Sequence, residues 1–418
     1  MSVGVLSRCV LVVRGGSSRW WASTTTNVTQ QQLFQQTDGH TPLHLQTTPP
    51  ILSSVRRVYS TVPQKKPDWN RAVSDAEKIV GYPTSYLTLR SLLSDEMSNI
   101  AVHMRKLVGS SHPLLKTAKR LIYNGRTNMQ TRGLIVLLIS KAAGHLNPEE
   151  FEQDQPGGVS LSQRSLAEIT EMIHTAHLIH KGVVNLSPTV FDGTTFQDME
   201  FGNKIAILSG DYLLANACTG LAALRSTKVV ELISTAISDF MEAEFIGERD
   251  NQGNPILNAD ITMNDWEEKN FLAAGSLMAK SCQATLLLAG HSEEMQSKGF
   301  EFGKQIALAW QAYSDLQPFT DLYRHPPGTS IDLTSAPVIL HLQRDKSLLD
   351  IVAKAGDSME NCDFKKIHQL VMSGHGVEAA KDLCQSHAQA ALNVLHEVID
   401  PSDARTALEN IINALRIY

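Results

Sequence analysis

The residues best placed to do chemistry form two short polar segments that lie far apart in the chain. The first segment reads Lys181, Gly182, Val183, Val184, Asn185, and the second reads Ser314, Asp315, Leu316, Gln317, Pro318. Magnesium in proteins is held by oxygen ligands, above all by carboxylates together with substrate phosphates. The two segments contain a single carboxylate, that of Asp315, and Lys181 adds an ammonium group. Their composition predicts no metal site.

Three histidines precede the first segment, at His174, His177 and His180. On a helix, offsets of three and six residues place the last side chain about 240° round from the first. Such side chains do not converge on one metal ion, and we expect packing roles for the three imidazoles. A solvated helix face and the start of a loop are expected for the acidic residues Glu242, Glu244 and Glu248.

The elements that must position these groups are predicted to be helices. Between residues 161 and 184, apolar side chains follow the three-and-four spacing of one buried helix face, at Leu166, Ile169, Ile173, Ala176 and Val183. A second helix is predicted to begin near Phe201. Clusters of Pro, Gly and Asn interrupt the helical pattern around residues 145–158, 186–195, 247–255 and 323–330. The C-terminal part predicts two more helices, 376–398 and 401–418, the latter with Pro401 in its first turn.

Composition excludes several classes of protein. The chain has 418 residues, of which 42% are hydrophobic and 19% charged, as in globular proteins with a sizeable core. A formal net charge of -6 argues against a nucleic-acid or membrane-surface protein, because such partners require a concentrated cationic surface. Five widely spaced cysteines without a CxxC pair indicate reduced thiols rather than a disulfide framework or a zinc site.

The first residues have the composition of an organelle presequence. They contain Arg8, Arg14 and Arg19, many Ser and Thr, and no acidic residue before Asp38. The apolar stretch around residues 10–13 is too short to span a bilayer, so no transmembrane segment is expected. We predict a mitochondrial presequence and disordered linker over residues 1–67, followed by one all-α domain over 68–418. The alternative is a disordered tail whose composition is accidental.

Three blocks carry a resemblance to a known family: IHTAHLIHKGVVN at 173–185, FGNKIAILSGDYLLANA at 201–217 and GKQIALAWQAYSDLQPF at 303–319. In order and spacing they resemble consecutive core helices of trans-polyprenyl diphosphate synthases, and the similarity covers roughly residues 70–418. The resemblance implies a single large helical bundle of the isoprenoid synthase type. Members of the family extend an allylic diphosphate with isopentenyl diphosphate, and two DDxxD motifs hold the magnesium ions.

The chain departs from the family at these motifs. The first motif falls on Lys181–Asn185, where all three aspartates are absent, and the second falls on Ser314–Pro318, where only Asp315 matches. Pro318 is expected to end its helix. The diphosphate-binding GGKxxRP element corresponds to residues 127–133, where Arg132 is retained and Met129 replaces the lysine.

The resemblance leaves the roles of the remaining polar residues open. Residual contacts to a diphosphate are implied for Arg132, Lys181, Gln311 and Asp315; alternatively, Arg132, Gln311 and Asp315 satisfy one another or face a partner. Lys181 is either a point charge that holds a diphosphate or a solvated cation at a helix C-terminus. Ala176, five positions before the first motif, is a tunnel position in long-chain synthases, or else an ordinary packing residue.

The resemblance, combined with the lost ligands, predicts a role without catalysis by this chain. We expect a non-catalytic subunit of a heteromeric, long-chain all-trans polyprenyl diphosphate synthase in the mitochondrial matrix, which supplies the ubiquinone side chain. The expected partner is a catalytic subunit in a heterotetramer, which would bind the Mg²⁺, with no cofactor on this chain. Two alternatives remain: a self-sufficient synthase with an unusual diphosphate site, and an isoprenoid-binding module without a synthase partner.

Overall fold

The structure is a computed structural model, and it describes residues 68–81, 112–114, 117, 131–146, 158–186, 193–250, 253–356 and 359–416. All of these residues belong to the unit Pro63–Tyr418. The expected presequence and linker over 1–67, and Met129, lie outside the described residues. The described part is helical and has no β-strand beyond one isolated bridge between Arg249 and Pro255. The prediction of an all-α fold is confirmed.

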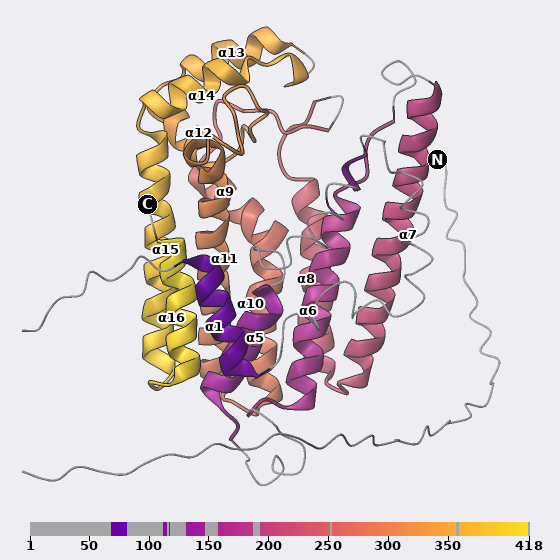
Figure 1. The fold of residues 1–418 in the computed structure, drawn as a ribbon, viewed down its shortest axis with the longest axis vertical. Helices are drawn as coiled ribbons and strands as arrows, with labels where there is room; N and C mark the ends of the chain where they lie inside the picture. Colours follow the sequence, from indigo (N-terminus) through magenta and orange to yellow (C-terminus); the bar gives the residue numbers. More distant parts are fainter. Residues whose placement is uncertain are drawn as a thin grey trace, which may run out of the picture. The chain divides into compact units, whose positions relative to one another are not determined.

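The helices run mostly side by side as a bundle, with shorter helices across one end (Figure 1). The long helices are α5 (Thr131–Ala143), α6 (Leu161–His180), α7 (Gly193–Ala223), α8 (Thr227–Glu244), α10 (Ser276–Leu288), α11 (Glu293–Thr320), α15 (Gly376–Val398) and α16 (Asp403–Leu415). The shorter ones are α1 (Trp69–Val80), α9 (Met263–Asn270), α12 (Ala336–Leu342), α13 (Ser347–Ala355) and α14 (Phe364–Ser373), with a 3₁₀ turn η4 (Met359–Asn361).

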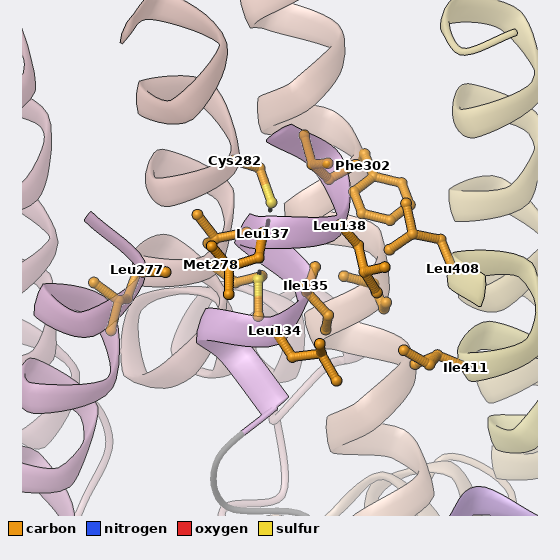
Figure 2. Packing of buried hydrophobic residues seen from close by; sticks show 14 of the residues in the cluster. Leu134, Ile135, Leu137, Leu138, Leu277, Met278, Cys282, Phe302, Leu408 and Ile411 are labelled. Carbon is orange, nitrogen blue, oxygen red and sulfur yellow. Dashed lines mark hydrogen bonds between the residues drawn. The ribbon is translucent and has the colours of Figure 1, made fainter. Parts of the chain in front are cut away.

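Helix α10 lies at the centre of the packing, because it contacts α5, α6, α8 and α11. Helix α5 is buried on all sides from Leu134 to Ile139, which explains its uninterrupted apolar sequence. Figure 2 shows the α5 leucines against Met278 and Cys282 of α10 and Phe302 of α11. These side chains belong to one large buried apolar cluster, which holds together the helices whose ends carry the polar segments.

Two glycines let α10 and α11 approach closely. A Cβ atom on Gly303 would lie 2.6 Å from the Ala279 Cα atom and 2.7 Å from the Met278 carbonyl oxygen. A Cβ atom on Gly299, one turn earlier, would collide with the Leu286 side chain. The position of α11 relative to the core therefore depends on the absence of side chains at these two sites.

Capping interactions fix where α6 begins and ends. The Ser160 hydroxyl accepts a hydrogen bond from the Gln163 backbone N–H at 3.1 Å, and the Gln163 side chain accepts one from the Ser160 N–H at 3.1 Å. The helix ends at His180, with Lys181 as its C-cap, so Val183 lies beyond the helix and is exposed. The following segment is held to α7, because the Asn203 amide bonds both backbone groups of Val184.

Three sequence-based boundaries were wrong. Helix α7 begins at Gly193 rather than near Phe201, since the Thr- and Gly-containing stretch continues the helix. Helix α11 runs through Pro318 to Thr320, because a proline in the last turn removes only one terminal hydrogen bond. Helix α16 begins at Asp403 with Ser402 as its N-cap, so Pro401 precedes the helix.

A π-helical turn joins α9 to α10. This turn, η3 (Phe271–Gly275), contacts both α8 and α11. Turns of this kind are frequent at functional sites because they change the direction of the side chains on either side. The turn lies next to the cavity described below.

Two further features of the described residues concern the long apolar helices and the cysteines. Two described stretches, Thr195–Ala223 and Met263–Leu288, are long and apolar enough to cross a membrane by length and composition alone. Of the most apolar window in each stretch, 39% is buried inside the protein in the first and 56% in the second. Cys218, Cys282, Cys362 and Cys384 are free thiols, as predicted, and Cys9 lies outside the described residues.

Candidate functional site

A cavity of about 530 Å³ lies between the ends of α6, α8, α9 and η3 and the middle of α11. We call it the site cavity. It brings together residues from both polar segments, which are more than a hundred positions apart in the chain. Its lining includes Arg132, His174, His177, Lys181, Gln311 and Ser314. The cavity therefore occupies the place where the sequence predicted chemistry.

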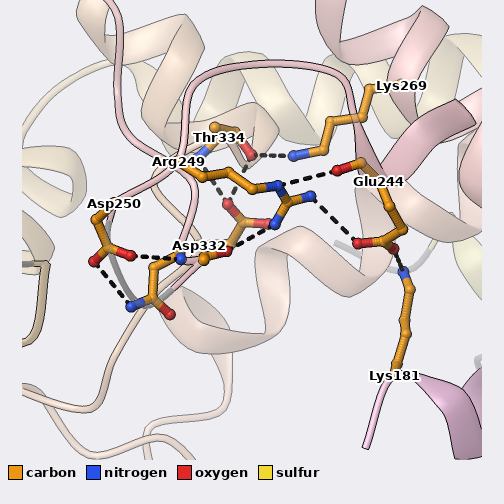
Figure 3. Close-up of polar contacts among 9 residues, drawn as sticks. Lys181, Glu244, Arg249, Asp250, Lys269, Asp332 and Thr334 are labelled. Atoms are coloured by element: carbon orange, nitrogen blue, oxygen red, sulfur yellow. Dashed lines mark hydrogen bonds and ion pairs between the residues drawn. The ribbon is translucent and has the colours of Figure 1, made fainter. Parts of the chain in front are cut away.

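Lys181 is held at the edge of this cavity by an ion pair with α8. Its ammonium group lies 3.3 Å from Oε1 of Glu244, and its side chain is 45% exposed. The other carboxylate oxygen of Glu244 accepts a hydrogen bond from Arg249 at 3.3 Å. Figure 3 shows Glu244 between the two cations. The end of α6, the end of α8 and the following loop are thus joined through a single carboxylate.

Arg132 projects from α5 toward His174 on α6. Its Nη1 atom lies 2.8 Å from Nε2 of His174. Since a guanidinium group only donates, the His174 Nε2 atom must be the acceptor and the ring is neutral. Burial, followed by the charge of Arg132, holds the pKa of His174 well below its usual range. Behind Arg132, burial raises the pKa of Glu171 to about 7.

His177 lies one turn further along α6 and is also buried. Its ring stacks on Phe240 of α8, with ring centroids 4.3 Å apart. Burial, followed by the charges of Lys181 and Arg132, lowers the pKa of His177 to about 3, so the ring is neutral at physiological pH. The His177 Nε2 atom has no hydrogen-bond partner among the described residues. Among the described residues, these histidines belong to no cluster of three or more His, Cys, Asp or Glu side chains that could hold a metal ion.

Asp315 points away from the site cavity. One carboxylate oxygen accepts hydrogen bonds from Nε1 of Trp266 and from the backbone N–H of Ala336, both at 2.9 Å. The other oxygen accepts from the Gln311 amide at 2.8 Å. Burial raises the pKa of Asp315 to about 7, although the three donors act in the opposite direction. Asp315 therefore ties α9, α11 and the start of α12 together.

The other sequence-predicted site residues fall into two groups. Gln311 and Ser314 line the site cavity, and the Ser314 hydroxyl donates to the Trp310 carbonyl at 2.9 Å. The rest lie outside the lining of the site cavity. Gly182 is buried close to the backbone of α6, and Asn185 is exposed. The Pro318 carbonyl lies 3.1 Å from the His368 ring, and Ala176 is fully buried between α6 and α7 in a cluster with Ile179, Ile205 and Leu213.

Comparison with known proteins identifies the family. The sequence pattern described as "Polyprenyl synthetase" matches residues 114–367. The chain belongs to the polyprenyl synthetase family. It is 48% identical to the human all trans-polyprenyl-diphosphate synthase PDSS2 over 354 residues, which cover 83% of this chain and 87% of that protein. It is 30% identical to a probable mitochondrial hexaprenyl pyrophosphate synthase of Yarrowia lipolytica, covering 84% of this chain and 89% of that protein.

Solved structures of polyprenyl synthetases share the fold. The apo form of a medium/long-chain prenyl pyrophosphate synthase from Arabidopsis matches with a TM-score of 0.53 and 26% identity, over 78% of this chain and 97% of that one. Heptaprenyl diphosphate synthase from Staphylococcus aureus matches with a TM-score of 0.59 and 18% identity, over 84% and 98% respectively. The second likeness concerns the fold alone.

Four charged residues that line the site cavity were not assigned to it from sequence: Glu244, Arg249, Lys269 and Asp332. Glu244 was expected to be a solvated helix residue, but it bonds two cations. Lys269 donates to the Thr334 hydroxyl at 3.0 Å, and Thr334 in turn bonds Asp332 (Figure 3). The contacts Lys181–Glu244 and Lys269–Thr334 join residues from distant segments, so no local spacing could have revealed them.

The cavity is poorly suited to a magnesium cluster and better suited to an anion. Among its described lining residues, carboxylates are present only at Glu244 and Asp332, whereas cations are present at Arg132, Lys181, Arg249 and Lys269. Magnesium sites need several oxygen ligands free to turn toward the ion. Here Glu244 already bonds Lys181 and Arg249, and Asp332 bonds Thr334. The donor set therefore does not fit the magnesium ions that the family resemblance implies.

Proposed function

We propose that this chain is a non-catalytic subunit of a heteromeric all-trans polyprenyl diphosphate synthase. The observation that carries the proposal is the ion pair between Lys181 and Glu244, which places an ammonium group where the family resemblance expects metal-binding aspartates. Ionisation of an allylic diphosphate requires concentrated positive charge from metal ions on the leaving group, and metal ions need carboxylate ligands. A catalytic homologue with intact motifs would bind the Mg²⁺ and carry out elongation.

Large apolar side chains are exposed on α7 and near the end of α8. Ile207 and Leu208 of α7 are 45% and 54% exposed, and Met241 and Phe245 near the end of α8 are 46% and 86% exposed. Large apolar side chains that are left exposed to solvent are typical of positions that another protein covers. We infer that the catalytic subunit packs on this surface, in a heterotetramer.

The proposed pathway role is the supply of the ubiquinone side chain in the mitochondrial matrix. The basic, Ser- and Thr-rich N-terminal sequence supports a mitochondrial address. The relatives from Yarrowia lipolytica and Neurospora crassa, each named as a probable mitochondrial hexaprenyl pyrophosphate synthase, support the same address. Long-chain prenyl diphosphates are the class of product that such relatives are named for.

The deciding experiment is expression of this chain with and without the catalytic homologue, followed by an assay of isopentenyl diphosphate incorporation with Mg²⁺. We expect elongation only when both chains are present, and co-purification of the two. Elongation by this chain alone would overturn the proposal in favour of a self-sufficient synthase. Leu208→Glu is expected to abolish co-purification, whereas Met372→Glu, a matched change at an exposed residue of α14, should leave it intact.

A further inference from the structure

A second cavity, of about 330 Å³, lies between the loop after α8, helix α9 and the start of α12. We call it the side cavity. It shares Pro255 and Lys269 with the site cavity, and Lys269 donates to the Thr334 hydroxyl at this boundary (Figure 3). The other residues in its walls belong to the side cavity alone.

The side cavity is apolar in its walls and acidic where its lining is exposed. Its walls include the large apolar side chains of Ile246, Ile256, Ile261, Trp266 and Ile339. The exposed part of its lining carries three carboxylates, Glu248, Asp260 and Asp265, which we call the acidic rim. Lys269 is the one cation among its described lining residues. This combination favours an apolar side chain that is flanked by a positive charge.

Hydrogen bonds hold the loop that forms one wall of the side cavity. The backbone N–H of Ile256 donates to the Glu248 carbonyl at 2.9 Å. The Asp250 carboxylate accepts from the backbone N–H groups of Asn254, at 2.7 Å, and of Met359, at 2.9 Å. The wall is therefore formed before any partner binds, which reduces the entropy lost on association.

The connection between α11 and α12 carries an exposed aromatic side chain. Tyr323 is 96% exposed, and Leu322 before it is 45% exposed. Asp321 holds the turn around them, because its carboxylate accepts the N–H of Arg324 at 3.2 Å and its carbonyl accepts the N–H of His325 at 2.9 Å. Tyr323 therefore projects from a preformed turn and does not occupy the side cavity of its own chain.

Charge makes this turn complementary to the side cavity. Arg324, next to Tyr323, lies 3.5 Å from the Asp321 carboxylate, and its side chain is 73% exposed. Exposed pairs of this kind contribute little to stability, and a guanidinium group has further N–H groups to donate. The turn thus presents an aromatic ring beside a positive charge, which matches an apolar cavity with an acidic rim.

The turn and the side cavity belong to the same connection of the chain. Tyr323 lies near the start of residues 321–335, and Thr334, near the end of this range, lines the side cavity. Because one chain carries both features, a second copy carries the counterpart of each. Two copies related by a two-fold axis would form the contact twice.

We propose that the side cavity binds Tyr323 of a second copy of this chain, with Arg324 of that copy beside the acidic rim. Each copy gives one tyrosine and receives one. The inference deepens the proposed function and rests on it for its role. Two pairs of this chain with the catalytic subunit need a further contact to form a heterotetramer, and this contact supplies it. The exposed apolar side chains of α7 and α8 remain for the catalytic subunit.

The test is the mass of the two-chain complex, measured by sedimentation. We expect two copies of each chain in the original complex. Tyr323→Glu places a carboxylate against the acidic rim, and Ile256→Trp fills the side cavity. Each should weaken the contact between copies by about tenfold or more, leaving one copy of each chain, while the catalytic subunit still co-purifies. Leu161→Glu, at an exposed leucine at the other end of α6 from Lys181, should retain both copies.

A mixture of the two variants isolates this contact from every other contact in the complex. A copy with Tyr323→Glu retains its side cavity, and a copy with Ile256→Trp retains its tyrosine. One of the two reciprocal contacts can therefore form between them. Differently tagged copies of the two variants should capture one another, whereas neither variant should capture itself. Mutual capture also shows that both variants are folded.

Several outcomes would overturn the inference. An original complex with one copy of each chain, or variants that retain both copies, would show that the contact does not exist. Failure of the two variants to capture one another would show that Tyr323 does not enter the side cavity. Loss of the catalytic subunit from Ile256→Trp, but not from Leu161→Glu, would assign the side cavity to the contact between unlike chains.

Failure of the subunit proposal would look different. In that case the catalytic homologue would not co-purify with the original chain, or this chain would elongate alone. The capture experiment with tagged copies, carried out on this chain by itself, would then still decide whether Tyr323 binds in the side cavity of a second copy.

Discussion

Lys181 at the end of α6 and Asp315 on α11 offer a comparison between the two polar segments. The family resemblance assigns both positions to metal-binding motifs. Asp315 matches its motif, yet its oxygens accept hydrogen bonds from Trp266, Ala336 and Gln311. Lys181 departs from its motif, yet it lines the cavity and pairs with Glu244. The matching residue has a structural role, whereas the replaced residue keeps its place at the site, so residue identity alone does not reveal which positions remain functional.

The largest expected effect on the free energy of unfolding comes from replacing Asp315. Asp315→Leu leaves the N–H groups of Trp266 and Ala336 without an acceptor, and each unsatisfied buried donor costs about 1–3 kcal/mol. We expect the free energy of unfolding in urea to fall by about 3 kcal/mol or more. Asp315→Asn should cost much less, about 1 kcal/mol, because its amide oxygen can accept both bonds and a flipped Gln311 can accept from its nitrogen.

The comparison between these two variants is the decisive part of that experiment. Asp382→Leu, at an exposed position on α15, should stay within about 0.5 kcal/mol of the original protein. If Asp315→Asn is as unstable as Asp315→Leu, the negative charge itself is needed, and the structural role assigned to Asp315 is wrong.

A smaller, pH-dependent effect is expected from His177. Its pKa in the folded protein is about 3, below the ordinary value of 6.5, so folding excludes a proton that the unfolded chain accepts. The stability contributed by the neutral ring is present above pH 6.5 and is lost as the pH falls from 6.5 toward 3, by up to about 1.4 kcal/mol per pH unit. His177→Phe, which retains a ring against Phe240, should therefore lose less stability than the original protein between pH 6.5 and pH 5.

Urea unfolding at several pH values measures this difference. His375→Phe, at an exposed histidine, is the matched control and should follow the original protein. Parallel stability curves for the original protein and His177→Phe would show that His177 titrates normally and is not the buried, neutral group described here.

The smallest expected effect on the free energy of unfolding comes from the ion pair between Lys181 and Glu244. The Lys181–Glu244 pair is about half exposed on both partners, and pairs of this kind contribute about 0–1 kcal/mol. Lys181→Ala, Glu244→Gln and the double variant, compared in a double-mutant cycle, should give a coupling free energy below about 1 kcal/mol that shrinks as salt is added. A coupling free energy as large as the loss of stability in Asp315→Leu would mean that the Lys181–Glu244 pair, like Asp315, is needed mainly to stabilise the fold.

Much of the fold followed from local patterns in the sequence. The helix over 376–398 was predicted with the bounds it has in α15, and the buried stripe of α6 was correct at Leu166, Ile169, Ile173 and Ala176. These features depend on residues within a few turns of one another. Errors arose where a proline lay close to a helix end. Pro318 lies inside the last turn of α11, and Pro401 lies before the first residue of α16. The preferences of proline place it near a helix boundary but do not determine whether it lies inside or outside the helix.

The site was less predictable than the fold. The sequence indicated Arg132, Lys181, Gln311 and Ser314, and all four line the site cavity. It missed Glu244, because the contact of Glu244 with Lys181 at the end of α6 joins residues more than sixty positions apart, and it missed Arg249, which reaches the site through Glu244. It also left open whether Gln311 and Asp315 satisfy one another, which they do. Which oxygen meets which donor is decided by tertiary packing.

The π-helical turn Phe271–Gly275 adds one residue to the otherwise continuous helix formed by α9 and α10. This extra residue rotates the side chains of α9 by about 100° around the helix axis relative to the side chains of α10. Lys269 and Asn270, before the turn, can therefore face the site cavity, while Leu277, Met278 and Cys282, after it, remain in the core. Removal of a single residue from the turn would make α9 and α10 one regular α-helix. The side chains of either α9 or α10 would then no longer face their present neighbours.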